Sequence, residues 1–224
     1  MKRIIALLLA LMMCLTLCAC GESKKVKELE AFIAENPYSC EDNEFINTEL
    51  YEKYQTYVDE LHEQGVTADE CAALKYAETV ASLSEYIPHL EFIRVCFAVA
   101  DKTAEGLKIV TDAANAYNEN SDRTAFRDAV AYDAKACFDE ANEIASEHSD
   151  NAEIQVLIDC LTKLSTNANN YGGAVFGNQN QMVLDICANG LEKAINVYMA
   201  TTDTALKFVE KINAVNDEIE ALEP

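Results

Sequence analysis

The sequence predicts an all-α protein: an elongated up-and-down bundle of five to seven helices with a long C-terminal helix. Glycine and proline are scarce, with 7 and 3 residues among 224, and the turns of a sheet protein would need more of both. Hydrophobic residues make up 50% of the chain, so a sizeable core is available. They recur at steps of three, four and seven, which is the spacing of one helix face.

The first half of the chain is expected to hold three helices separated by turn signals. Asn36-Pro37 ends the first one, because proline cannot continue a helix. The second runs from about residue 41 to 62 and stops before Gly65, in the position where glycine often closes a helix. A capping box over Thr67–Glu70 starts the third, and Pro88 breaks or kinks it.

Short polar residues set the expected boundaries in the second half. The segment that follows the proline ends near Tyr117, and Ser121 caps a further helix that reaches His148. Ser149 or Asp150 caps the next helix, because either side chain can accept a hydrogen bond from a free backbone amide.

The last helix has the most regular pattern in the chain. One apolar set recurs every seven residues: Leu184, Leu191, Tyr198, Ala205, Ile212 and Ile219. A second set follows four residues after each of the first five: Ala188, Ile195, Thr202, Val209 and Asn216. A sustained period of 3.5 residues predicts one helix, packed along its length, from about Gln179 to Ala221 and about 60 Å long.

The N-terminus carries a targeting signal. Lys2 and Arg3 precede an uncharged stretch of 14 residues, Ile4 to Leu17, which is short for a membrane span and typical of a signal peptide. The stretch runs into Leu17-Cys18-Ala19-Cys20, which resembles a bacterial lipobox. The alternative is an ordinary secretory signal in which the cysteine has no role.

The lipobox resemblance implies that Cys20 receives a covalent diacylglycerol and becomes the mature N-terminus. Residues 1–19 are then the signal peptide, 20–25 a short lipidated tether and 26–224 a single acidic helical domain. Loss of the two basic signal residues changes the net charge from -22 to -24. The mature chain is therefore expected at the extracytoplasmic face of a bacterial cell membrane, held by its acyl chains.

The sequence offers no pattern for catalysis. It lacks GxSxG, HExxH and a Gly-rich phosphate loop, so we predict that the protein is not an enzyme and has no cofactor beyond the lipid. His62, His89 and His148 do not form the Glu-x-x-His pairs of a di-iron bundle, so we expect solvated surface histidines and no metal site. The negative charge argues against nucleic acid as a partner.

Six cysteines follow Cys20, and their spacing fits no zinc motif: Cys40, Cys71, Cys96, Cys137, Cys160 and Cys187. An exported chain permits disulfides between them but does not require them. Several lie close to apolar helical stripes, where small buried thiols are common, so free thiols are favoured over a disulfide framework.

Residues 167–181 differ from the rest of the chain. They hold three of the seven glycines and no charge, which predicts a long connection between two helices. Its candidate interaction residues are Tyr171, Gly172, Gly173, Phe176 and Gly177. The aromatic rings either fold back onto the end of the bundle or project as anchors for a partner.

The favoured function is a membrane-anchored lipoprotein that acts as a non-catalytic binding or scaffold module for a protein partner or small ligand. The alternative is a ligand-binding sensor or metal-handling bundle with a pocket between its helices. An apolar cavity with converging Tyr or Glu would favour this alternative, and a fully packed core would favour the scaffold.

Replacement of the lipobox cysteine tests the anchor. Cys20→Ala removes the thiol that the diacylglycerol would modify, so the variant should neither label with palmitate nor partition into the detergent phase, whereas the wild type should do both. Equal labelling of the two proteins would refute the lipobox assignment.

Overall fold

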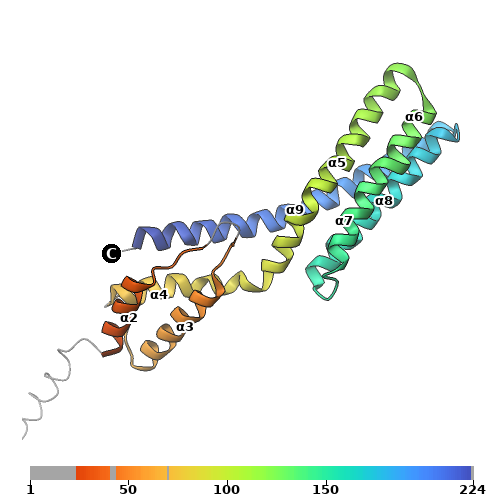
Figure 1. The fold of residues 1–224 in the computed structure, drawn as a ribbon. Helices are drawn as coiled ribbons and strands as arrows, with labels where there is room; N and C mark the ends of the chain where they lie inside the picture. The colour runs from red at the N-terminus through yellow and green to blue at the C-terminus, as the bar shows by residue number, and fades with distance from the viewer. Residues whose placement is uncertain (1–23, 41–43, 70, 223–224) are drawn as a thin grey trace, which may run out of the picture. The chain divides into compact units, whose positions relative to one another are not determined.

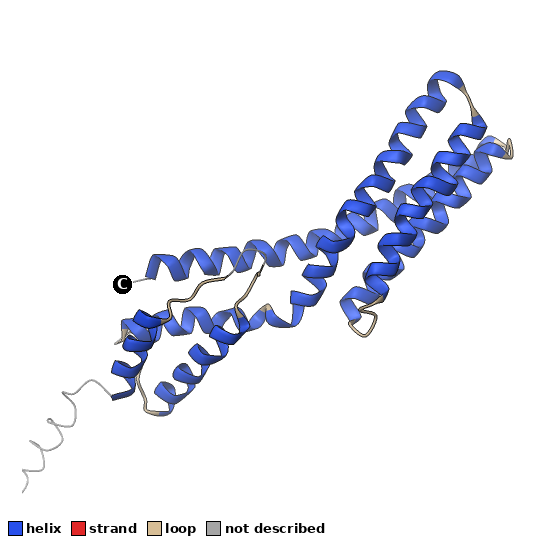
Figure 2. Ribbon diagram, viewed as in Figure 1, coloured by secondary structure: helices blue, strands red, loops and turns tan. Residues whose placement is uncertain are grey.

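The computed structural model describes residues 24–40, 44–69 and 71–222, and all regular structure in this part of the chain is helical (Figures 1 and 2). The predicted all-α class is confirmed, and so is the long C-terminal helix. The signal peptide and Cys20 lie outside the described residues. No helix within them is long and apolar enough to cross a membrane.

The described residues pack as two compact units, and the prediction of a single domain over residues 26–224 stays a prediction. Unit 1 comprises the described residues up to Ile87 together with those from Ile212 onwards. Unit 2 comprises Pro88–Lys211. Each unit has its own buried residues and is described by itself.

Unit 1 contains α2 (Lys24–Glu35), α3 (Thr48–Glu63), α4 (Ala72–Ala81) and the end of α9. The predicted end of the first helix at Asn36-Pro37 is confirmed. Helix α3 begins later than expected, because the side chain of Asn47 caps it and accepts a hydrogen bond from the amide of Leu50 at 3.1 Å.

Gly65 closes α3, as the sequence predicts. Its φ of 76° lies in the left-handed region, which glycine adopts without steric cost. Its amide donates to the carbonyl of His62 at 2.9 Å, and the amide of Val66 donates to the carbonyl of Leu61 at 3.1 Å. These two bonds form a Schellman motif, which satisfies carbonyls that the helix end would leave free.

The predicted capping box at Thr67 is wrong. Helix α4 begins only at Ala72, and its N-cap is Cys71, whose Sγ accepts a hydrogen bond from the amide of Leu74 at 3.4 Å. The chain makes a turn from Ala68 before the helix starts, with the amide of Cys71 donating to the Ala68 carbonyl. A thiol is a weak acceptor, so this sequence gives little sign of the cap.

Buried tyrosines hold the α2–α3 connection in unit 1. The hydroxyl of Tyr54 donates to the carbonyl of Asn36 at 2.6 Å. The amide of Tyr38 donates to the hydroxyl of Tyr76 at 2.9 Å, and the amide of Asn47 donates to the hydroxyl of Tyr38 at 3.1 Å. Phenol groups therefore satisfy backbone groups that a connection packed against a core cannot leave unpaired.

Unit 2 is an up-and-down arrangement of long helices (Figure 1). Helices α4 and α5 (Leu90–Asn120) are joined by 3₁₀ turns η1 (Ser82–Glu85) and η2 (Ile87–His89), which confirms the predicted break at Pro88. The chain returns along α6 (Arg123–Arg127), the π-helical segment η3 (Asp128–Ala134) and α7 (Lys135–Ser146). It then reverses into α8 (Ala152–Phe176) and again into α9 (Gln181–Leu222).

Two predicted caps in unit 2 are each displaced by a residue or two. Ser121 does not begin a helix but ends α5 with a φ of 56°, and Asp122 caps α6 through bonds of 3.0 Å from two amides. Asn151, not Ser149 or Asp150, caps α8. Neighbouring polar residues compete for each cap, and the packing of the helices decides between them.

Helix α9 confirms the heptad prediction. It spans 42 residues, close to the predicted bounds. The first apolar set is buried from Leu191 onwards, and Leu184 is half-buried. All members of the second set, from Ala188 to Asn216, are half-buried.

The loop predicted over residues 167–181 is wrong. Helix α8 continues through Gly172-Gly173 to Phe176. The connection is confined to residues 177–180, where Asn178 adopts a φ of 52° and the Asn180 side chain accepts from the amide of Val183 at 3.2 Å. Of the three glycines that suggested a loop, Gly172 packs against a neighbouring element, Gly173 faces open space and Gly177 lies in the connection.

Gly172 lets α8 approach the π-helical segment. A Cβ at this position would lie 2.8 Å from the Cβ and 2.9 Å from the backbone nitrogen of Ala131. The same holds for Gly106, where a Cβ would lie 2.6 Å from the ring of Phe138. Both glycines are therefore packing residues inside helices, because no side chain fits between the two elements.

Two adjacent glycines provide a matched test of this packing. Gly172→Ala should destabilise the protein by about 1–3 kcal/mol, because the new methyl group meets backbone atoms that cannot rotate away. Gly173→Ala should stabilise it by up to about 1 kcal/mol, because nothing lies within 4 Å and alanine favours a helix. Urea unfolding measures both, and equal midpoints would contradict the close approach.

Candidate functional site

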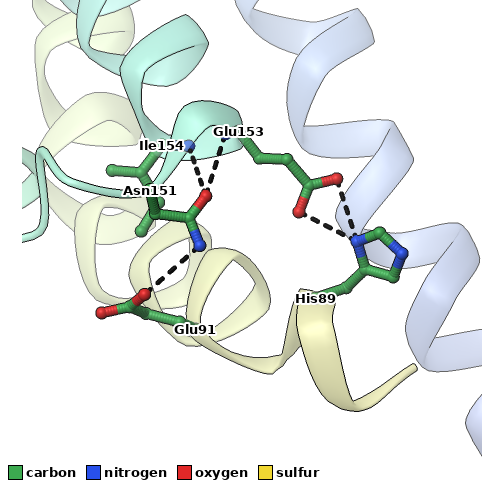
Figure 3. Close-up of polar contacts among 5 residues, drawn as sticks. All are labelled: His89, Glu91, Asn151, Glu153 and Ile154. Carbon is green, nitrogen blue, oxygen red and sulfur yellow. Dashed lines mark hydrogen bonds and ion pairs between the residues drawn. The ribbon is translucent and has the colours of Figure 1, made fainter. Parts of the chain in front are cut away.

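Two reciprocal histidine–glutamate pairs join the start of α5 to the region where α7 ends and α8 begins. The Nδ1 atom of His89 lies 2.9 Å from both carboxylate oxygens of Glu153 (Figure 3). The Nδ1 atom of His148 lies 3.0 Å from Oε1 of Glu91. Each side of the junction thus supplies one histidine and one glutamate. We call these four residues, with Asn151, the histidine–glutamate cluster.

Asn151 connects the two pairs. Its side-chain oxygen caps α8 by accepting from the amides of Glu153 at 2.9 Å and Ile154 at 3.3 Å. Its Nδ2 donates to Oε2 of Glu91 at 3.2 Å, as Figure 3 shows. Glu153 stands in the first turn of α8, where the positive end of the helix dipole favours a carboxylate.

His89 also stacks on an aromatic ring of α9. Its imidazole lies parallel to the ring of Phe208, with centroids 4.1 Å apart and planes 10° apart. A carboxylate accepts hydrogen bonds, so the contact with Glu153 is satisfied when Nδ1 of His89 carries a proton. Figure 3 shows Nε2 turned away from the carboxylate.

The electrostatics of the second pair affect its carboxyl group. The hydrogen bond from His148, and secondarily that from Asn151, lowers the pKa of Glu91 below its ordinary value of 4.5.

In the part of the chain that the structure describes, no group of three or more His, Cys, Asp or Glu side chains is placed to hold a metal ion.

A shallow groove adjoins the cluster and has a volume of about 450 Å³. Helices α5, α8 and α9 contribute its lining: Phe92, Glu153, Val156, Asn196, Val197, Ala200, Thr201 and Thr204. Of these residues, Phe92 is buried, whereas Val156 and Val197 are exposed. We call this the unit 2 groove. Glu153 belongs both to the groove and to the histidine–glutamate cluster.

Large exposed hydrophobic side chains are concentrated in unit 2. All nine that occur among the described residues lie there: Phe97, Tyr132, Val156, Phe176, Met182, Ile186, Val197, Met199 and Leu206. Five of the nine are on α9. The part of α9 outside its buried stripe is therefore itself partly apolar, on more than one face.

Four of the five candidate interaction residues lie on α8, Gly177 follows its end, and together they do not form one surface. Tyr171 is half-buried and meets Phe126 edge to face at 5.2 Å, and burial raises the pKa of its phenol. Phe176 is 46% exposed, with the guanidinium of Arg127 lying 4.0 Å from its ring centroid. Gly172 is buried against η3.

Sequence reasoning missed the pairing of the histidines. Each one has a glutamate partner, since His62 also lies 2.6 Å from Glu78. The two partners of the cluster are 64 and 57 residues away along the chain, so no local spacing signals them. Only the antiparallel return of the helices in unit 2 brings them together.

The six described cysteines are free thiols. Cys96, Cys137 and Cys160 are buried, and burial raises the pKa of the Cys96 thiol to about 12. A thiol with such a pKa stays protonated near neutral pH and is a poor nucleophile.

Comparisons with known proteins give no relative: no family model, no curated protein and no solved structure matches this chain.

The lowered pKa of Glu91 predicts a pH-dependent contribution to stability. A carboxyl group whose pKa is lowered by folding contributes stability at pH values above its pKa in the unfolded chain. This contribution to stability is lost as the pH falls through the pKa of the folded state. Glu91→Gln should therefore lower the urea midpoint at pH 6 and leave it nearly unchanged at about pH 2.5. The exposed Glu52 provides the control, because Glu52→Gln should have little effect at either pH. An equal loss from Glu91→Gln at both values would contradict the pairing.

Proposed function

We propose that this protein is a lipid-anchored, extracytoplasmic binding module that acts without catalysis and uses an apolar surface of unit 2. The observation that carries the proposal is the location of the nine large exposed hydrophobic residues, all of which lie in that unit. Exposed apolar groups that gather on one part of a protein mark interaction sites.

The charge of α9 supports the same surface. Residues 181–211 carry four acidic and three basic side chains, in a chain whose net charge is -22. The net charge of this stretch is therefore 3 − 4 = −1, so it repels an acidic partner far less than the rest of the chain does. The rest of the chain, being strongly acidic, keeps the protein soluble around that stretch.

The anchor is supported by the sequence. The lipobox at Leu17-Cys18-Ala19-Cys20 would place two acyl chains at the mature N-terminus, and a diacyl anchor is sufficient for stable membrane residence. Lys24, Lys25 and Lys27 follow within a few residues, where cations meet anionic headgroups.

A pocket in unit 1 favours a second candidate, the binding of a small ligand. Its volume is about 300 Å³, and it is lined by Glu30, Ile33, Ala72, Ala73, Tyr76 and Leu222. A carboxylate and a tyrosine beside apolar groups are typical of a ligand-binding pocket between helices.

Site-specific photo-crosslinking in intact cells tests the proposed function. A photoreactive residue at Val197, on the exposed face of α9, should give protein adducts in the anchored chain. The same residue at Glu52, which is exposed in unit 1, should give none. Adducts at Glu30, beside the unit 1 pocket, with none at Val197, would contradict the proposal and favour the second candidate.

A further inference from the structure

We propose that the pocket of unit 1 binds a small organic ammonium ion, an amine with a compact apolar body, whose charge lies beside the carboxylate of Glu30. This inference goes beyond the unit 2 surface and names the chemical class of ligand that the unit 1 pocket takes. It follows from the lining of the pocket, from one exposed carboxylate within it and from the charge around it.

Three helices of unit 1 form this pocket. Ile33 of α2, Tyr76 of α4 and Leu222 of α9 contribute its large side chains. Ala72 and Ala73, at the start of α4, contribute only methyl groups, so the space between the larger side chains stays open. The volume of about 300 Å³ lies at the lower end of the range for pockets that bind small molecules. The ligand is therefore small and largely apolar.

One acidic side chain completes the lining. Glu30 of α2 is exposed and forms no ion pair with another described residue. The polar group of Tyr76 serves the fold, because its hydroxyl accepts a hydrogen bond from the amide of Tyr38 at 2.9 Å. Glu30 is therefore the group of the lining that is placed to meet a charge on a ligand.

The charge of unit 1 favours a cation. Residues 24–87 and 212–222 include 18 acidic and 5 basic side chains, which gives a net charge of 5 − 18 = −13. The end of α9 that belongs to this unit carries Asp217, Glu218 and Glu220 and no basic residue. A cationic ligand is attracted to such a surface, and an anionic ligand is repelled.

Positive groups close to the pocket are fewer than the carboxylates there. Lys27 stands one turn before Glu30 on α2, and the dipole of α4 presents about half a positive charge at Ala72. Against them stand Glu30 itself and the three acids at the end of α9. Of these three, Glu218 precedes Leu222 by four residues and shares its helix face. The local balance of charge is negative, so it also favours a cation.

The remaining lysines of unit 1 do not neutralise the carboxylate of the pocket. Lys24, Lys25 and Lys53 form ion pairs with other acidic side chains. Lys75 lines a separate hollow, together with Glu218. A ligand that brings its own positive charge therefore gains an ion pair that the described residues do not already make.

Three compounds with the same apolar body are the probe: cyclohexylmethylamine, cyclohexylmethanol and cyclohexanecarboxylate. Calorimetric titration of the full lipidated chain in nanodiscs of neutral lipid, with empty nanodiscs as the blank, measures each Kd. The amine should bind about fivefold more tightly than the alcohol, because its ammonium group gains a partly solvated ion pair with Glu30. The carboxylate should not bind, and added salt should weaken the binding of the amine alone.

Matched variants locate the site. Glu30→Gln should lower the affinity for the amine to that for the alcohol, whereas Glu52→Gln, at an exposed position of α3, should change it less than about twofold. Ala73→Leu fills the pocket and should abolish binding of both compounds. Ala31→Leu adds the same bulk at an exposed position of α2 and should leave binding unchanged. Lys27→Gln should tighten binding of the amine, and circular dichroism checks that each variant is folded.

Four results would overturn the inference. Binding of the alcohol as tightly as the amine, or binding of the carboxylate, would refute the charge of the ligand. Equal losses from Glu30→Gln and Glu52→Gln would show that cations gather over the whole acidic surface. Unchanged binding in the Ala73→Leu variant would place the site elsewhere, and no binding of any compound would refute the pocket as a ligand site. None of these results affects photo-crosslinking at Val197, so the proposed function is tested separately.

Discussion

Burial of one apolar stripe on α9 is the constraint on which both units depend. Leu191, Tyr198 and Ala205 bury their side chains within unit 2, and Ile212 and Ile219 do so within unit 1. In proteins, most of the stability of a helix comes from the packing of its apolar face rather than from its own propensity, so the burial of this stripe supplies most of the stability of α9. The stripe also determines which apolar residues of α9 stay exposed. Those that lie outside the stripe form part of the surface on which the proposed function rests.

The close packing of unit 2 depends on small residues as much as on large ones. Gly106 and Gly172 remove the side chains that would otherwise separate neighbouring helices. At Gly172 the neighbour is the π-helical segment, whose Ala131 is itself small. Packing of this kind lets a chain with net charge -22 bring helices together despite the mutual repulsion of its carboxylates. Exposed ion pairs along single helices offset only a little of that repulsion.

The helices whose sequence signals are local and repeated could be predicted from the sequence alone. The heptad pattern gave α9 nearly to the residue, and Gly65 and Pro88 marked real boundaries. It failed at Gly172-Gly173, because a glycine needed for close packing and a glycine needed for a turn look the same in one sequence. The neutral Asn-rich surroundings favoured the turn, and only the position of η3 against α8 decides for packing.

The candidate site was beyond sequence reasoning for a different reason. His89 and Glu153 are 64 residues apart, and they meet only because α8 begins beside the start of α5. Neither residue stands in a motif, so each looked like one more solvated group on an acidic chain. The exposed hydrophobic residues of α9 were equally ambiguous, since apolar residues lie on several faces of that helix and periodicity identifies only the most regular face.

Glu153 takes part both in the contact between α5 and α8 and in the lining of the unit 2 groove. Its carboxylate holds His89, whose ring stacks on Phe208 of α9, and the same side chain lines the groove. A full cation bound there would compete with the imidazole for the carboxylate and would weaken the junction between α5 and α8. Any ligand charge placed in the groove therefore acts on the same carboxylate that holds this junction together.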